Sequence, residues 1–100
     1  MTITQLFGII TLKKNLRQEN SYISSLFSQG VDRIIQKVGE EAVELVIAAK
    51  NQSKERVISE AADLVFHSLV LFSALGISPN EIMQELELRN VKRNDTIQQE

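Results

Sequence analysis

The stretch KVGEEAVELVIAA, residues 37–49, and the stretch SEAADLVFH, residues 59–67, decide how this chain folds. In each stretch, ionisable side chains recur at offsets of three and four residues, which places them on one face of an α-helix. They are Lys37, Glu41 and Glu44 in the first stretch and Glu60, Asp63 and His67 in the second. Because only a short polar break separates the two predicted helices, we expect their acidic faces to meet.

The carboxylates on these two faces predict a site for a divalent cation. Like charges a few ångströms apart in a poorly solvated groove cannot all remain ionised unless a cation lies between them. The predicted ligands are Glu41, Glu44, Glu60 and Asp63. Oxygen ligands, in a chain with no cysteine and one histidine, favour Mg²⁺, with Mn²⁺ as the alternative, over zinc. Since Mg²⁺ is usually completed by waters and substrate phosphates, the site implies a phosphorylated substrate.

The predicted helix that carries Glu60, Asp63 and His67 is apolar almost all round from Val57 to Leu75, apart from these three ionisable residues. Such a helix is buried on nearly every side, in a core or between subunits, and ionised carboxylates need partners there. A membrane span is not expected, because the uncharged run is too short and each acid near the bilayer centre costs about 3 kcal/mol. A single chain of this size has too few helices to cover this one, so we predict a homodimer with a central helix bundle.

Of four side chains near the predicted cation site, three have two readings each. His67, one turn after Asp63, either orients the site through a hydrogen bond or binds the metal. Lys37 either forms a salt bridge with the glutamate one turn later, worth a few tenths of a kcal/mol, or reaches a substrate phosphate. Arg33, one turn earlier on the same side, would add a second cation. Glu40 is either a solvated surface residue or part of the catalytic machinery.

Periodicity and capping residues predict a single all-α domain over residues 1–100, with about five helices. Ser53 is the expected cap of the fourth helix, Gly30 and Gly76 end helices, and Ser78 with Glu81 form a capping box. The core is expected over about residues 4–89, and residues 90–100 are expected to fray because they lack a periodic apolar face. The predicted helices run from near Thr4 to Arg17, from Tyr22 to Gln29, from Val31 or Asp32 to about Lys50, from the break at Asn51–Glu55 to about Leu75, and from Pro79 to about Arg89.

Composition and charge predict an ordinary soluble protein. The chain is 43% hydrophobic with a net charge of -2, which is neither the basic surplus of a nucleic-acid binder nor the charge excess of a disordered chain. At the N-terminus the apolar run 6–12 is followed by its lysines instead of being preceded by them, the reverse of a secretory signal. We therefore expect a cytoplasmic protein that binds neither nucleic acid nor membrane.

Two longer runs carry a resemblance to a known family. SYISSLFSQGVDRIIQKVGEEAVELVIAAKN (residues 21–51) and ERVISEAADLVFHSLVLFSALGIS (residues 55–78) resemble phosphoribosyl-ATP pyrophosphohydrolase, the enzyme of the second step of histidine biosynthesis. Its superfamily, the all-α MazG-like nucleoside triphosphate pyrophosphohydrolases, has an EExxE pattern followed by ExxD. The pattern appears here as Glu40, Glu41, Glu44, Glu60 and Asp63. Phe66 departs from the family's usual tyrosine, and the residues before Ser21 lack its usual proline or glycine.

The resemblance implies a reaction and roles for individual residues. Mg²⁺ would bind the triphosphate of phosphoribosyl-ATP, and water would cleave between the α and β phosphates to give phosphoribosyl-AMP and pyrophosphate. Glu40 or one of the ligand carboxylates would accept the water's proton. Lys37 and Arg33 would stabilise phosphate charge, while Ser21 and Tyr22 would contact the substrate. As no cyclohydrolase domain is attached, a stand-alone homodimer with active sites near the subunit interface is expected.

Two other functions also fit these residues. A house-cleaning pyrophosphohydrolase would use the same metal site on free dNTPs or damaged nucleotides. A helical dimerisation module would use the acids only to bind a structural cation.

Overall fold

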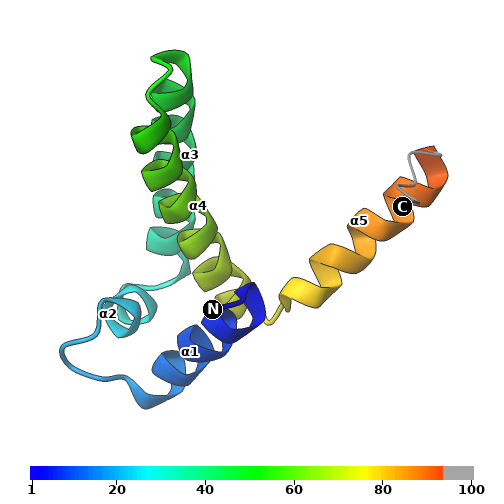
Figure 1. The fold of residues 1–100 in the computed structure, drawn as a ribbon. Coiled ribbons are helices and arrows are strands. Elements are labelled where there is room, and N and C mark those ends of the chain that lie inside the picture. Colours follow the sequence, from blue (N-terminus) through cyan, green and yellow to red (C-terminus); the bar gives the residue numbers. More distant parts are fainter. Residues whose placement is uncertain (94–100) are drawn as a thin grey trace.

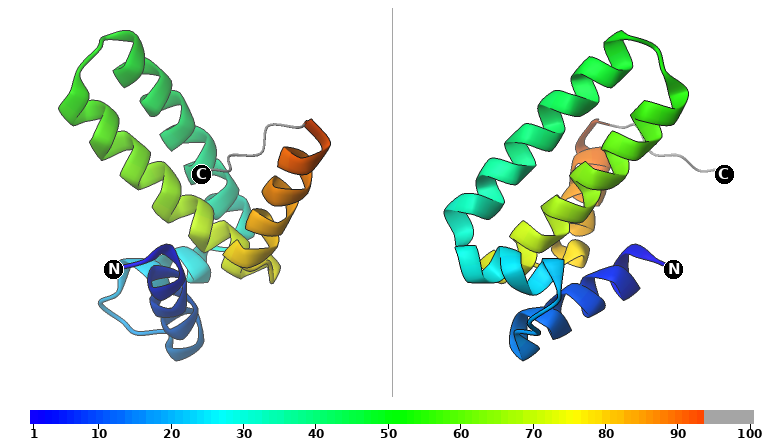
Figure 2. Two further views of the ribbon diagram at one scale, coloured as in Figure 1. Left: turned by 45° about the vertical axis from the view of Figure 1, so that its right-hand side comes forward. Right: turned by 90° about the vertical axis from the view of Figure 1, so that its left-hand side faces the viewer.

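The computed structural model describes residues 1–93 of the chain, and all regular structure within them is helical (Figure 1). The prediction of an all-α fold with about five helices is therefore confirmed. In Figures 1 and 2, α3 and α4 form a long antiparallel hairpin, α1 and α2 lie at its base, and α5 projects away from it. The helices are α1 (Ile3–Leu16), α2 (Tyr22–Gln29), α3 (Val31–Lys50), α4 (Lys54–Leu75) and α5 (Pro79–Arg93).

The helix ends form at the predicted capping residues. The Ser53 hydroxyl accepts a hydrogen bond from the Arg56 main-chain N–H at 3.3 Å at the start of α4. At the start of α5, Ser78 and Glu81 bond reciprocally: the Ser78 N–H donates to the Glu81 carboxylate at 2.9 Å, and the Glu81 N–H donates to the Ser78 hydroxyl at 3.3 Å. Gly76 ends α4 with a positive φ of 73°, a left-handed conformation that glycine adopts without strain.

The boundaries of two helices, α1 and α5, differ from the prediction. α1 begins one residue earlier, with Thr2 as its cap, and ends at Leu16, because Arg17 is left-handed with φ 52°. α5 continues to Arg93, so the expectation that the chain frays from residue 90 is wrong for residues 90–93. Local propensity explains this extension, since no glycine or proline interrupts the segment and an Arg89–Glu85 ion pair of 3.0 Å links successive turns. The rest of the predicted tail, residues 94–100, lies outside the described residues.

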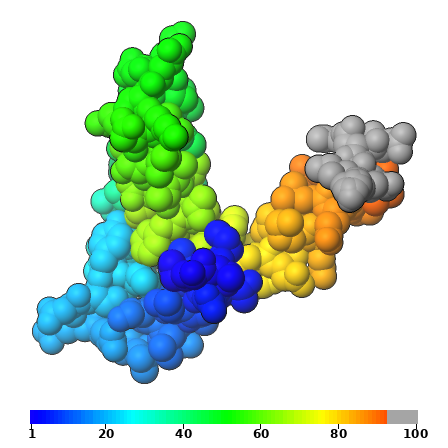
Figure 3. Space-filling model, in the orientation of Figure 1, coloured from blue at the N-terminus to red at the C-terminus, as the bar shows by residue number. Residues whose placement is uncertain are grey.

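The apolar core lies at the base of the hairpin, where α1 and α2 meet the beginning of α3 and the end of α4. Its fully buried side chains come from all four of these helices: Ile10, Leu26, Ile34 and Val70. By contrast, α5 makes few contacts and exposes its large apolar side chains, and the space-filling view shows it diverging from the hairpin (Figure 3). The two acidic stretches therefore lie on the hairpin above the core.

The hairpin leaves apolar side chains uncovered within one chain. Ile58 and Val65 are exposed on α4, and Val43, Val46 and Ile47 are exposed on α3. One chain therefore does not cover α4 on every side, which agrees with the expectation that a single chain has too few helices to do so; burial between subunits stays a prediction. By length and composition α4 would suffice to cross a membrane, a property that core helices of soluble proteins share.

The packing at the base predicts different costs for two neighbouring isoleucines. Ile10 is fully buried, whereas Ile9 is 43% exposed on the same helix. Replacing Ile10 by alanine should lower the free energy of unfolding by about 2–5 kcal/mol, because a cavity replaces a packed side chain. The matched control I9A should change it by less than about 1 kcal/mol. Urea denaturation at one protein concentration measures both, and equal losses would contradict the assigned core.

Candidate metal centre

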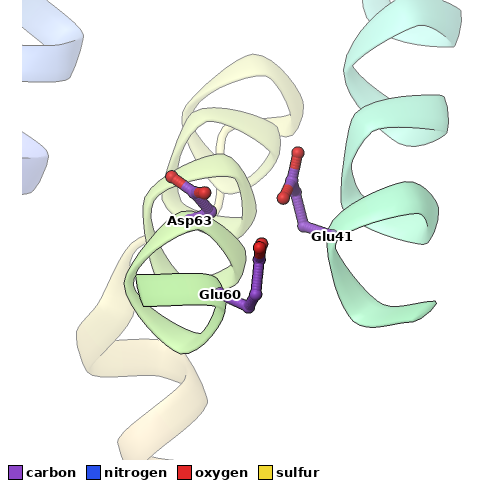
Figure 4. Close-up of side chains that lie close together, drawn as sticks. All are labelled: Glu41, Glu60 and Asp63. Atoms are coloured by element: carbon purple, nitrogen blue, oxygen red, sulfur yellow. The ribbon is translucent and has the colours of Figure 1, made fainter. Parts of the chain in front are cut away.

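Helices α3 and α4 bring three carboxylates together midway along the hairpin. Glu41 reaches across from α3 toward Glu60 and Asp63, which lie one turn apart on α4 (Figure 4). One ligand oxygen from each lies within 4.8 Å of the others. The predicted meeting of the two acidic faces is thus observed, and we refer to Glu41, Glu60 and Asp63 as the acidic triad.

The acidic triad is buried at its inner end and open at its outer end. Glu41 is 5% exposed and Glu60 is 9% exposed, whereas Asp63 is exposed. The Oε1 atoms of Glu41 and Glu60 are buried and have no hydrogen-bond partner among the described residues. Buried carboxylate oxygens are normally paired or coordinate a metal. Two such oxygens beside a third carboxylate fit a hard divalent cation that takes oxygen ligands.

Glu44, the fourth predicted ligand, lies beside Glu60 at the edge of the acidic triad. It is exposed, and its proximity to Glu60 helps to raise the pKa of the Glu60 carboxyl. The structure thus gathers all four predicted ligand residues, three within one group and the fourth next to it. Metal binding itself stays a prediction.

Burial and neighbouring acids raise the pKa of Glu60. Burial is the largest cause, followed by the charge and hydrogen bond of Glu44 and then the charges of Asp63 and Glu41. Arg56 Nη2 lies 3.5 Å from Glu60 Oε2, but this arginine is largely exposed, so its attraction is screened and does not reverse the shift. The ion pair between Arg56 and Glu60 was not predicted, although a spacing of four residues on one helix could have indicated it.

The predicted cations lie on the α3 side of the site. Lys37 Nζ is 3.1 Å from Glu41 Oε2 and 3.8 Å from Glu40 Oε1, and the hydrogen bond with Glu41 is the main cause that raises the pKa of Lys37. Arg33 Nη1 is 3.9 Å from Glu40 Oε1, and the Gln36 amide donates to Glu40 Oε2 at 3.0 Å. Glu40 is therefore held among these residues and not in the acidic triad.

His67 contacts the main chain of the site and an aromatic residue from α2. Its Nδ1 lies 2.7 Å from the main-chain oxygen of Asp63, and its Nε2 lies 2.8 Å from the Tyr22 hydroxyl. These contacts fit the orienting reading better than metal ligation, since both ring nitrogens have other partners. Ser21 caps α2, where its hydroxyl accepts the Ser24 N–H at 3.2 Å. No sequence spacing predicts the His67–Tyr22 bond, because the residues lie 45 positions apart.

Comparison with known proteins yields one family and several relatives. Residues 3–90 match the family model described as phosphoribosyl-ATP pyrophosphohydrolase. A phosphoribosyl-ATP pyrophosphatase of Clostridium acetobutylicum is 41% identical over 90 residues, which are 90% of this chain and 82% of the relative. One of Pelotomaculum thermopropionicum is 40% identical over 92 residues, covering 92% and 94%. The histidine biosynthesis bifunctional protein HisIE of Oceanobacillus iheyensis is 49% identical over 75 residues, covering 75% of this chain and 35% of that protein.

The raised pKa of Glu60 predicts how stability depends on pH in the presence of a chelator. The native state binds this proton more tightly than the unfolded chain, in which the pKa is near its ordinary value of 4.5. Stability should therefore fall as pH rises from about 4.5 through the raised native pKa, and then stay low. In E60Q this loss should be absent, so the melting temperature of E60Q minus that of wild type should grow between pH 4 and pH 7.5.

The control for this measurement is E87Q, which changes an exposed glutamate on α5 and should leave the wild-type pH profile unaltered. A difference between E60Q and wild type that is constant across this pH range would show that Glu60 does not carry the native-state proton.

Proposed function

The chain belongs to the phosphoribosyl-ATP pyrophosphohydrolase family, and we propose that it hydrolyses phosphoribosyl-ATP to phosphoribosyl-AMP and pyrophosphate in histidine biosynthesis. The observation that carries this proposal is the pair of buried carboxylate oxygens, on Glu41 and Glu60, that have no partner among the described residues. They lie where the two acidic stretches of the family-matched segment converge. Hydrolysis of a phosphoanhydride is a reaction that such an oxygen-rich site supports.

The acidic triad and Glu44 are proposed to hold a divalent cation, Mg²⁺ or Mn²⁺. The hard oxygen donors and the unpartnered buried atoms support this assignment. When bound, the cation would supply positive charge to phosphate oxygens and lower the pKa of a coordinated water.

Lys37 and Arg33 are proposed to bind the substrate's phosphates. The ammonium group of Lys37 adjoins the acidic triad through Glu41, and this hydrogen bond raises its pKa above the ordinary value, so Lys37 is a cation at neutral pH. Arg33, whose guanidinium suits bidentate contact with phosphate oxygens, lies on the same side of α3. Negative charge that develops on the phosphates during cleavage would thus be stabilised by these side chains.

The proton of the attacking water is proposed to pass to a carboxylate on α3. The candidates are Glu40, which lies outside the proposed ligand set, and the ligand carboxylates Glu41 and Glu44. Glu40 lies among cations and an amide donor, and Glu44 lies beside Glu60. Ser21 and Tyr22, on the neighbouring helix α2, are proposed to contact the substrate.

A homodimer in the cytoplasm is proposed as the working form. The exposed apolar side chains of the hairpin, among them Val46 on α3 and Ile58 on α4, support it, because a second copy would remove them from water. The active sites would then lie near the subunit interface.

The proposed reaction predicts metal-dependent pyrophosphate release from phosphoribosyl-ATP that is lost in E60Q. The substitution keeps the size of the side chain but removes a charge from the cation site, so the rate should fall by about 100-fold or more. Circular dichroism and thermal melting would check that E60Q is folded, and E87Q would serve as the active control. A combination of higher stability in chelator and lost activity is expected only if Glu60 is a functional ligand.

A substrate panel decides between this proposal and the two alternatives. Turnover of ATP or dNTPs without turnover of phosphoribosyl-ATP would indicate a house-cleaning enzyme. No turnover of any nucleotide by folded, Mg²⁺-supplied protein would indicate a dimerisation module.

The proposed dimer predicts a melting temperature that depends on concentration. Unfolding of an obligate dimer is coupled to dissociation, so the midpoint should rise between two concentrations about a hundredfold apart. Identical midpoints, together with a monomeric mass by light scattering, would refute the dimer.

A further inference from the structure

The ring of Tyr22 is fixed at one end and on one face, and yet it is 53% exposed. Its hydroxyl bonds to His67, which is only 4% exposed. Its ring stacks on Phe66 with centroids 6.1 Å apart and planes at 22°, and it meets the His67 ring edge-on at 5.8 Å. A large aromatic side chain is thus held rigidly at the surface, where much of its area has no partner among the described residues.

The hydrogen bonds of His67 define what the Tyr22 hydroxyl can offer to a ligand. A main-chain oxygen only accepts, so the contact with Asp63 places the hydrogen of the neutral imidazole on Nδ1. Nε2 is then an acceptor, and the Tyr22 O–H donates to it. Because a phenol has one hydrogen, Tyr22 has no donor left for a phosphate oxygen. The surface that it presents to a ligand is the ring itself.

Tyr22 lies next to the side of the site that carries the cationic residues. It is close enough to Lys37 to contribute to the raised pKa of that residue, and Lys37 bonds to Glu41 of the acidic triad at 3.1 Å. Tyr22 is also linked to the acidic triad by geometry, because His67 bonds to the Tyr22 hydroxyl at 2.8 Å and to the main-chain oxygen of Asp63 at 2.7 Å. A ligand whose phosphates reach Lys37 and a cation held by the acidic triad would therefore have its remaining part within reach of the Tyr22 ring.

We propose that the exposed ring of Tyr22 stacks against the aromatic base of the nucleotide substrate, with His67 and Phe66 as positioning residues that hold the ring. This inference rests on the proposed function, because it names the part of the substrate that α2 binds. Base stacking on an aromatic side chain tolerates any base, since every base has a π face. The phosphates would then bind to Lys37 and Arg33 on α3 and to the cation held between α3 and α4, and the base would bind to an uncharged ring on α2.

The chain supplies its own probe for this contact. It contains one tyrosine and no tryptophan, so its tyrosine emission reports on Tyr22 alone. AMP should quench the emission saturably, whereas ribose 5-phosphate, which has the phosphate but no base, should not. Free N-acetyltyrosinamide corrects for light absorbed by AMP. Equal responses to the two ligands would overturn the proposal, as would emission that changes with protein concentration but not with AMP, because the ring would then lie between subunits.

Two substitutions of Tyr22 distinguish the role of its ring from the role of its hydroxyl. Y22L removes the aromatic face and should raise the KM for phosphoribosyl-ATP by about 10- to 100-fold, with the change falling mainly on KM and not on kcat. Inhibition by pyrophosphate, which has no base, should be unchanged. Y22F keeps the ring and should have a smaller effect. An equal loss in Y22F and Y22L would assign the role to the hydroxyl and overturn the stacking proposal.

The positioning role of His67 is tested by two amides. Glutamine can place an oxygen near the position of Nε2 and accept the Tyr22 O–H, whereas asparagine can replace only the Nδ1 donor. H67Q should therefore keep most of the affinity for AMP that H67N loses. If His67 had only a structural role, the affinity for AMP would instead follow the stability of the two variants. Nitrogen NMR of the single histidine should show the hydrogen on Nδ1, and a hydrogen on Nε2 would overturn this role.

The proposed reaction and the proposed stacking surface can be refuted independently of each other. If phosphoribosyl-ATP is not hydrolysed but AMP still quenches Tyr22, the stacking surface stands and the reaction is wrong. If hydrolysis is selective and Y22L is kinetically normal, the reaction stands and the stacking surface is wrong.

Discussion

The close approach of Glu41 and Glu60 between α3 and α4 is the constraint on which the rest of the structure depends. Two buried carboxylates with oxygens within 4.8 Å of each other oppose the packing of the helices that carry them, because each loses hydration and each repels the other. Apolar contacts at the base of the hairpin, including Ile34 and Val70, oppose this repulsion. The core thus lies at one end of the α3–α4 pair and the acidic residues lie farther along it, so the hairpin holds its charges together by packing elsewhere.

The cations near the acidic triad compensate it incompletely and unevenly. Lys37 bonds to one oxygen of Glu41, and Arg56 reaches one oxygen of Glu60 at 3.5 Å, but the second oxygen of each glutamate is left without a partner among the described residues. In the proposed reaction this leaves room for a divalent cation, while Lys37 faces the phosphates that the same cation would bind.

Local features of the structure were predictable from sequence, and contacts between distant segments were not. The helix starts at Ser53 and Ser78 were predictable because a cap depends on residues within one turn. Helical periodicity was likewise enough to predict that Glu41 lies toward Glu60. The bond between Tyr22 and His67 depends on how α2 lies across the end of the hairpin, for which no spacing rule exists. The sequence predicted that one chain leaves α4 partly uncovered, but an apolar surface indicates only that something covers it and not what does so.

The adjacent glutamates 40 and 41 show how one pattern serves two sides of a helix. Successive residues are turned by about 100° around the axis, so Glu41 faces α4 and Glu40 faces Arg33, Gln36 and Lys37. Glu41 therefore lies between the acids of α4 and the ammonium group of Lys37, whereas Glu40 is surrounded by two cations and an amide. Only Glu41 can belong to a cation site between the helices. Glu40 can act only from the α3 side, and Lys37, with one carboxylate 3.1 Å away and the other 3.8 Å away, is the residue that connects these two surroundings.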